Sequence, residues 1–258
     1  MEPSASDILS HADAGVLTLT INRIARKNSL TSAMYAQLAD GIEQAAGNAV
    51  IRAVVLQGHE SIFSAGNDIG DFLNAPPAGS DSPVYRFLRA IATFDKPLVA
   101  AVCGPAVGIG TTMLLHCDLV YAGDNAAFSM PFVNLGLCPE AASSLLAPLM
   151  FGYHRAAESL LLGEPMSAES ALEVGLVNRI VPPTEANALA QAQAAKLAAK
   201  PLSSLIATKQ LMKRGQRDAV LRQMDAEGEH FGRLLREPAA REAFTAFMDK
   251  RKPDFSKL

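Results

Sequence analysis

Short apolar runs alternate with segments of helical period over roughly the first 150 residues. Runs at residues 15–22, 52–58, 98–103 and 119–122 have the length and composition of buried strands. Between them, residues 31–46 predict a helix with Thr31 as its cap, and residues 82–94 predict a helix with a first-turn proline. A further helix is expected to start near Gly108. This alternation predicts an α/β core.

Beyond Gly152 the chain is expected to be almost only helical. The expected helices cover residues 167–174, 184–199, 201–213, 216–235 and Pro238 to about Arg251.

Composition and charge exclude several classes of function. The chain has 258 residues, 49% of them hydrophobic, which suffices for a sizeable core. Its apolar runs are shorter than a membrane span, and MEPSASDILS does not resemble a secretory signal, so we expect a soluble intracellular protein without a membrane partner. The net charge is −3 with basic residues scattered except at 250–252, which argues against a nucleic-acid partner.

The metal-ligating and nucleophilic residues show no motif of their own. Cys103, Cys117 and Cys138 lie in apolar segments and are expected to be buried reduced thiols. Their spacing and that of the histidines do not fit a metal site. His116 is expected to cap carbonyl groups at a helix end. The glycines of GPAVGIG are not spaced as in a dinucleotide-binding loop.

Two glycine-containing turns and one carboxylate carry the chemistry. The turns are FSAGNDI, residues 63–69, and CGPAVGIG, residues 103–110; Glu140 follows in NLGLCPEAASS. Gly66 and Gly110 lack a Cβ, so a ligand oxygen is expected to approach the main chain there, and the helix near Gly108 would add its positive dipole end. These features predict an oxyanion hole.

With these turns, INRIARKNSLT at residues 21–31 and FMDKRKPDF at 247–255, the chain resembles the crotonase family of enoyl-CoA hydratases and isomerases almost end to end. The resemblance implies a spiral of ββα units over residues 1–195, holding the active site. A helical trimerisation region would follow over residues 196–258, giving trimers or dimers of trimers. No sequence repeat supports the spiral independently.

The resemblance also implies the contacts of a CoA thioester. The amides of Ala65 and Ile109 would form the oxyanion hole, and Lys250 with Phe247 would reach the nucleotide of a neighbouring subunit. No other cofactor is expected, since coenzyme A is part of the substrate. The residues expected to contact it are Arg26, Lys27, Ser64, Gly66, Asp68, Ile69, Gly110, Phe247 and Lys250. The alternative for the basic residues is a simple solvated loop.

The acids present favour an isomerase. Hydratases of this family use two glutamates, and Thr112 and Phe132 stand at those positions. The segment AFSMPFVNLGLCPEAASS resembles the Δ3,Δ2-enoyl-CoA isomerase branch, in which the glutamate of PE, here Glu140, is the sole base. It would remove the C2 proton of a 3-enoyl thioester and return it at C4. The alternative for Glu140 is a helix N-terminal residue, but an acid in an apolar stretch suits proton transfer.

Other residues near these turns have two interpretations. Asp68 is expected to hold its loop by accepting backbone N–H groups rather than to act chemically. Phe72 and Leu73 either wall the acyl pocket or belong to the core. The runner-up functions are an enoyl-CoA hydratase or other acyl-CoA lyase and, from a different class, a non-catalytic acyl-CoA-binding scaffold. The terminal Ser256-Lys257-Leu258 would be a peroxisomal address in a eukaryote, whereas the preceding KRKPDF favours a bacterial cytoplasm.

Overall fold

The computed structural model describes residues 6–74, 79, 81–256 and 258, and their side chains except those of Leu73 and Asn74. Two expectations concern residues outside this set. One is the expectation that the amino terminus is no secretory signal, which rests partly on residues 1–5. The other is the possible peroxisomal address, which includes Lys257.

The strands in the described residues form two sheets, and the predicted α/β class is confirmed. The larger sheet has the order β1-β2-β3-β4-β6-β9, in which only β1 and β2 pair antiparallel. The smaller sheet has the order β5-β7-β8. The strands are β1 (Ile8–Asp13), β2 (Val16–Ile21), β3 (Ala53–Gln57), β4 (Leu98–Val102), β5 (Pro105–Val107), β6 (Leu119–Gly123), β7 (Ala127–Ser129), β8 (Met166–Ser167) and β9 (Arg179–Val181).

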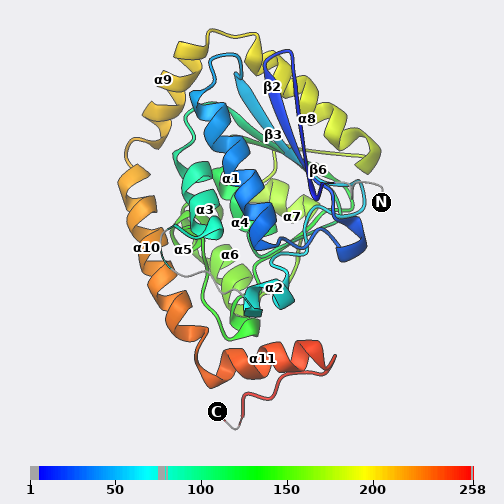
Figure 1. The fold of residues 1–258 in the computed structure, drawn as a ribbon, viewed down its shortest axis with the longest axis vertical. Helices are drawn as coiled ribbons and strands as arrows, with labels where there is room; N and C mark the ends of the chain where they lie inside the picture. The colour runs from blue at the N-terminus through cyan, green and yellow to red at the C-terminus, as the bar shows by residue number, and fades with distance from the viewer. Residues whose placement is uncertain (1–5, 75–78, 80, 257) are drawn as a thin grey trace.

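Helices connect and cover these strands (Figure 1). The α-helices are α1 (Ser32–Gly47), α2 (Ile69–Asn74), α3 (Pro83–Thr93), α4 (Ile109–Thr112), α5 (Ser143–Phe151), α6 (Tyr153–Ala157), α7 (Ala168–Glu173), α8 (Pro183–Ala198), α9 (Leu202–Lys213), α10 (Arg217–Leu234) and α11 (Pro238–Met248). Short turns of 3₁₀-helix are η1 (Ile24–Arg26), η2 (Met113–His116) and η3 (Val133–Leu135), and η4 (Glu158–Leu162) is a π-helix. The Thr31 side chain caps α1 by accepting from the Met34 N–H at 3.3 Å, as predicted. Ser82 and Pro83 open α3 as expected, but the Ser82 hydroxyl makes no capping bond.

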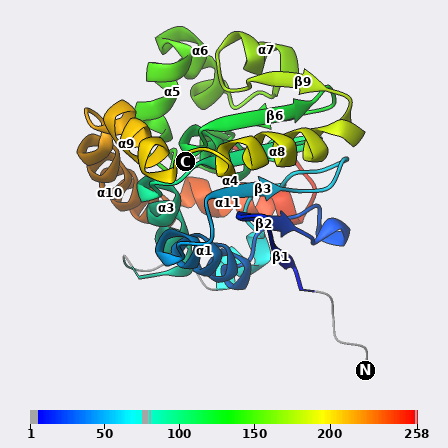
Figure 2. The same ribbon diagram turned by 90° about the horizontal axis from the view of Figure 1, so that it is seen from above.

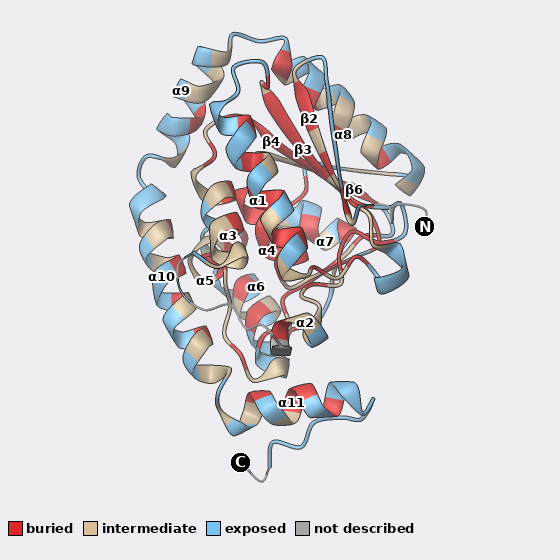
Figure 3. Cartoon of the chain, in the orientation of Figure 1, coloured by how far each residue is buried: buried red, intermediate tan, exposed pale blue. Residues whose placement is uncertain are grey.

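The central strands β3, β4 and β6 of the larger sheet are buried on both faces, which explains why they are almost continuously apolar. On β3, Val54 and Leu56 belong to the main core with α1 and α3. Val55 on the opposite face packs with Ala190 and Ala194 of α8, whose small side chains bring that helix close to the strands. Figure 2 shows α8 beside β3 and β6, and Figure 3 shows burial concentrated on the strands.

Beyond Gly152 the described chain is almost only helical, as predicted, apart from the short strands β8 and β9. β9 pairs with β6 and ends the larger sheet. Strands of two or three residues are too short to show a period in the sequence, which is why they were not predicted. The last helices run down one side of the molecule as α9 and α10 and then cross its end as α11 (Figure 1). α10 contacts α3 and α5, and α11 contacts η3.

Candidate active site

The two predicted glycine turns lie against each other. A parallel bridge joins Ser64 to Ala106, and the Val107 N–H donates to the Ser64 carbonyl at 2.9 Å. A Cβ on Gly66 would lie 2.9 Å from the Val107 oxygen, and one on Gly110 would lie 3.0 Å from the Ser64 oxygen. These glycines therefore permit contact between the two turns, whereas the sequence analysis had reserved that space for a ligand.

The structure corrects the first oxyanion residue. The Ala65 N–H, predicted to face the thioester, donates to the Lys27 carbonyl at 3.0 Å. In the bridge between Leu30 and Asn67, the Leu30 N–H donates to the Gly66 carbonyl and the Asp68 N–H donates to the Leu30 carbonyl. The groups on either side of Asn67 therefore face Leu30. The Asn67 N–H accordingly faces the other way, and no described residue accepts a hydrogen bond from it.

The second predicted amide has the expected geometry. Ile109 is the first residue of α4, and no group among the described residues accepts from its N–H. Gly108 precedes it with φ 55° and ψ −117°, a conformation that residues with a Cβ avoid. Asn67 and Ile109 line the same cleft. Each turn thus supplies an unpaired main-chain N–H from a residue that lines this cleft, Asn67 in the first and Ile109 in the second.

Glu140 lies between η3 and α5, on the loop before the helix rather than in it. The Thr112 hydroxyl at the end of α4 donates to Glu140 Oε1. Burial raises the pKa of Glu140 to about 8, with the Thr112 hydrogen bond opposing the rise and the negative charge of Glu227 adding to it. A carboxyl group in this range can exchange protons near neutral pH.

The cleft beside the two amides has a volume of about 680 Å³. It is lined mainly by apolar side chains and passes between the turns, η3 and α11. The predicted contact residues that line it are Arg26, Lys27, Ala65, Gly66, Asp68, Ile69, Ile109 and Phe247. Phe247 comes from α11 of the same chain, so the last helix closes over the cleft of its own subunit.

Three predicted contact residues lie elsewhere. Ser64 is fully buried, and its hydroxyl donates to the Asn28 carbonyl at 2.9 Å while accepting from the Gly66 N–H at 3.1 Å. Gly110 packs beneath the first turn, and Lys250 is exposed after α11. None of the three is among the described residues that line the cleft.

Asp68 holds its loop, partly as predicted. Its Oδ1 accepts from the Asp71 N–H at 3.1 Å, but its Oδ2 also pairs with Arg23 at 2.7 Å. The Arg23 hydrogen bond lowers the pKa of Asp68 and keeps it charged. Neither Arg23 nor Asn28 was predicted. The buried amide of Asn28 donates to the carbonyls of Ile21, Ile62 and Phe63.

A smaller cavity lies next to Glu140. It has a volume of about 20 Å³ and shares Asn67, Phe72 and Phe231 with the larger cleft. Phe72 is buried, and its ring centre lies 6.0 Å from that of Phe231. Phe72 lines both cavities and also belongs to the main core, so both of its interpretations fit its position. The side chain of Leu73 lies outside the described set.

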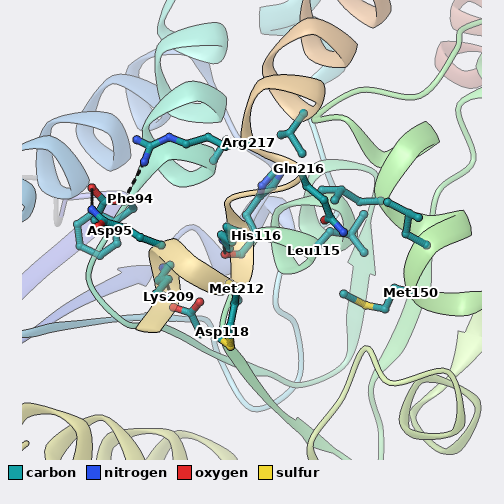
Figure 4. A pocket seen from close by; sticks show the side chains of 17 residues that line it. Phe94, Asp95, Leu115, His116, Asp118, Met150, Lys209, Met212, Gln216 and Arg217 are labelled. Carbon is teal, nitrogen blue, oxygen red and sulfur yellow. Dashed lines mark hydrogen bonds and ion pairs between the residues drawn. The ribbon is translucent and has the colours of Figure 1, made fainter. Parts of the chain in front are cut away.

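Another hollow, of about 400 Å³, lies near the start of α10 (Figure 4). Its acids are paired, Asp118 with Lys209 at 2.7 Å and Asp95 with Arg217 at 3.2 Å. His116 also lines it and is hydrogen-bonded to the Ala141 carbonyl at 2.7 Å. The histidine therefore binds a carbonyl as expected, but that carbonyl belongs to the turn before α5 and not to the helix that His116 ends. Burial lowers the pKa of His116 to about 4, which keeps the ring neutral.

The His, Cys, Asp and Glu side chains of the described residues form no group of three or more placed to hold a metal ion. Cys103 is buried, Cys117 and Cys138 are partly buried, and all three are free thiols. Among the helices described, none is long and apolar enough to cross a membrane.

Comparisons with known proteins agree with one another. A family model described as enoyl-CoA hydratase/isomerase matches residues 11–257. The chain is 37% identical to 1,2-epoxyphenylacetyl-CoA isomerase of Escherichia coli over 96% of its own length and 98% of that protein. It is 33% identical to 2,3-dehydroadipyl-CoA hydratase of the same organism, over 97% and 98%. Among solved structures, an enoyl-CoA hydratase/isomerase from Pseudoalteromonas atlantica superposes with a TM-score of 0.93 at 40% identity, covering 97% of this chain and 100% of the other.

Proposed function

Because the chain belongs to the enoyl-CoA hydratase/isomerase family, we propose that it is an enoyl-CoA isomerase that converts 3-enoyl-CoA thioesters to trans-2-enoyl-CoA. The observation that carries the proposal is the pairing of one carboxylate, Glu140, with Thr112 at the position where a hydratase has its first acid. Phe132, 6% exposed, stands in place of the second. One acid suffices for a 1,3-proton shift, whereas adding water requires a second group.

The proposed reaction moves one proton. Glu140 takes the C2 proton, and the electron pair of that C–H bond delocalises through C3 and C4 and onto the thioester oxygen. The amides of Asn67 and Ile109, with Asn67 in place of the predicted Ala65, would stabilise the dienolate oxygen. The protonated Glu140 then returns the proton at C4, leaving the double bond between C2 and C3. Atoms and charge balance without another reactant.

The surroundings of Glu140 favour this reaction over hydration. The Thr112 hydroxyl donates its proton to Glu140, and a hydroxyl is no base for activating water at neutral pH. The Phe132 ring presents no proton acceptor. A hydratase remains the alternative, supported by the name of the second relative. A non-catalytic acyl-CoA scaffold would have no use for an acid held by Thr112 beside a cavity that Asn67 also lines.

The substrate would enter through the larger cleft. Its CoA portion would lie along Arg26 and Lys27, whose charges neutralise phosphate groups, and against Phe247. The acyl end would lie where the larger cleft meets the small cavity, beside Phe72 and Phe231. We further propose that residues 196–258 form the assembly region of a homotrimer or hexamer, that no cofactor beyond the CoA of the substrate is needed, and that the enzyme works in a bacterial cytoplasm.

Two rates measured on one preparation test this function. Isomerisation of a 3-enoyl-CoA raises the absorbance of the conjugated thioester, and hydration of trans-2-enoyl-CoA lowers it. We expect isomerisation to be faster by roughly 10²–10⁴-fold, the usual contribution of a general acid or base. Hydration as fast as isomerisation would favour the hydratase, and the absence of both reactions with intact CoA binding would favour the scaffold.

A further inference from the structure

Glu227 is a buried carboxylate in the middle of α10. Glu227 is only 5% exposed, and no cationic side chain among the described residues forms an ion pair with it. Instead it binds the start of α5, which has no side-chain cap of its own. Glu227 Oε2 accepts from the Ala142 N–H at 2.6 Å, and Oε1 accepts from the Ser144 N–H at 2.9 Å and from the Ser144 hydroxyl.

The segment that Glu227 binds is strained. Ala141 and Ala142 have φ of 61° and 56°, in the left-handed region, where a residue with a Cβ is less stable by about 1–2 kcal/mol. Such a conformation persists only when surrounding contacts impose it. Besides Glu227, the hydrogen bonds to this segment include that from His116 to the Ala141 carbonyl at 2.7 Å, that from the Leu146 N–H to the Ala142 carbonyl at 2.9 Å and that from the Ser143 hydroxyl to the Glu140 carbonyl at 2.6 Å.

We infer that Glu227 is a positioning residue for Glu140, holding the strained turn so that the carboxylate of Glu140 stays against Thr112 and beside the small cavity that Asn67 also lines. Glu140 lies two residues before Ala142, and its carbonyl is bound by the Ser143 N–H and hydroxyl. Glu227 thus fixes the main chain of the base from α10, while Thr112 fixes its side chain from α4. The inference rests on the proposed role of Glu140 as the base.

Glu227 also acts on Glu140 through its charge. Its negative charge raises the pKa of Glu140, after burial and the opposing bond from Thr112. Tyr35 of α1 and Tyr85 of α3 face Glu140 as well, and burial raises the pKa of both phenols, so they stay neutral when Glu140 titrates. A change at Glu227 should therefore move the pH profile, which a purely structural residue would not do.

The test is Glu227→Gln, with Glu229→Gln as the matched control on the exposed face of the same helix. The amide keeps the size of the side chain, but its nitrogen cannot accept from an N–H, so one clamping bond is lost. We expect kcat on a 3-enoyl-CoA to fall roughly 10- to 100-fold, with KM changing little, because a base displaced by about 1 Å loses this much. The acid limb of kcat/KM, which rises as Glu140 loses its proton, should move to lower pH. Glu229→Gln should change neither.

A double variant separates this inference from the proposed function. If Glu227 works through Glu140, then Glu140→Gln with Glu227→Gln should be no slower than Glu140→Gln alone. Should Glu227→Gln not fold, Ser144→Ala removes one donor of the same clamp and should lower kcat about 3- to 10-fold, by the same misplacement argument. Unchanged kcat and pH profile in the variant that folds would overturn the role of Glu227. Wild-type turnover of Glu140→Gln would instead overturn the proposed base.

Discussion

The two halves of the candidate site are held in different ways. The two oxyanion turns fix each other through backbone hydrogen bonds and through glycines that allow them to touch, as Gly66 does against Val107. The Asn28 side chain adds to this backbone framework. The turn carrying Glu140 contains two strained alanines and is held by the side chains of His116 and Glu227. A site can therefore combine a part fixed mainly by its main chain with a part whose strained backbone is held by side chains.

The largest expected effect among the comparison variants comes from the oxyanion half, which is fixed mainly by its main chain. Gly108→Ala places a Cβ in a glycine-only conformation immediately before Ile109, so the Ile109 amide should shift. We expect kcat to fall by about 10²-fold, as when one oxyanion donor is lost. Gly152→Ala is the matched control, because Gly152 has φ 77° with open space around its Cβ position and lies outside the described cleft lining.

Both glycine variants should lose stability, but only Gly108→Ala should lose turnover per folded molecule. Thermal denaturation and kinetics on the same samples give both quantities. Equal losses of kcat in the two variants would show that strain, rather than the Ile109 amide, limits activity.

A smaller effect concerns the acid in the other half. Because burial raises the pKa of Glu140 to about 8, the folded state holds a proton between about pH 4.5 and 8 that the unfolded state releases. The free energy of unfolding therefore falls as pH rises through this window. Glu140→Gln removes this titration while leaving an oxygen for Thr112, so its Tm should exceed that of the wild type increasingly from pH 5 to 9.

Each kcal/mol of that difference should appear as roughly 2–4 °C in Tm for a chain of this size. A constant difference in Tm across the pH range would contradict a raised pKa at Glu140.

The smallest effect tests the strain itself. Ala142→Gly should relieve the left-handed backbone and stabilise the protein by about 0.5–1 kcal/mol. Because the Ala142 N–H still donates to Glu227, Glu140 should move by well below 1 Å. Turnover should therefore stay within about threefold of the wild-type value. Ala192→Gly on the exposed face of α8 is the control, expected to destabilise by about 0.5–1 kcal/mol. A stabilised variant with much lower turnover would mean that the side chain of Ala142 matters directly.

The sequence predicted most of the fold and about half of the site's geometry. Thr31 is a recognisable cap and the central strands are continuous apolar runs, so α1 and the core of the larger sheet were expected. β1 was missed because it is mostly exposed and shows no alternation. Glu140 was identified through its motif, but which amide of the first turn is free depends on the bridge between Leu30 and Asn67, which no local pattern reveals.

The residues that hold Glu140 could not be predicted from local sequence patterns for a related reason. Glu227 lies 85 positions from Ala142, and a glutamate inside an amphipathic helix ordinarily faces solvent. Thr112 was noted only for the acid it replaces, since its hydrogen bond to Glu140 exists only once α4 and the loop before α5 are packed together.

The most direct test of the account is the turnover of Glu140→Gln on a 3-enoyl-CoA, measured together with its affinity for the CoA thioester. The variant keeps the size of the side chain and can still accept the Thr112 hydrogen bond, so only the proton acceptor is lost. The account predicts a fall in kcat of about 10²–10⁴-fold with little change in binding. Wild-type turnover in a folded Glu140→Gln protein would contradict it.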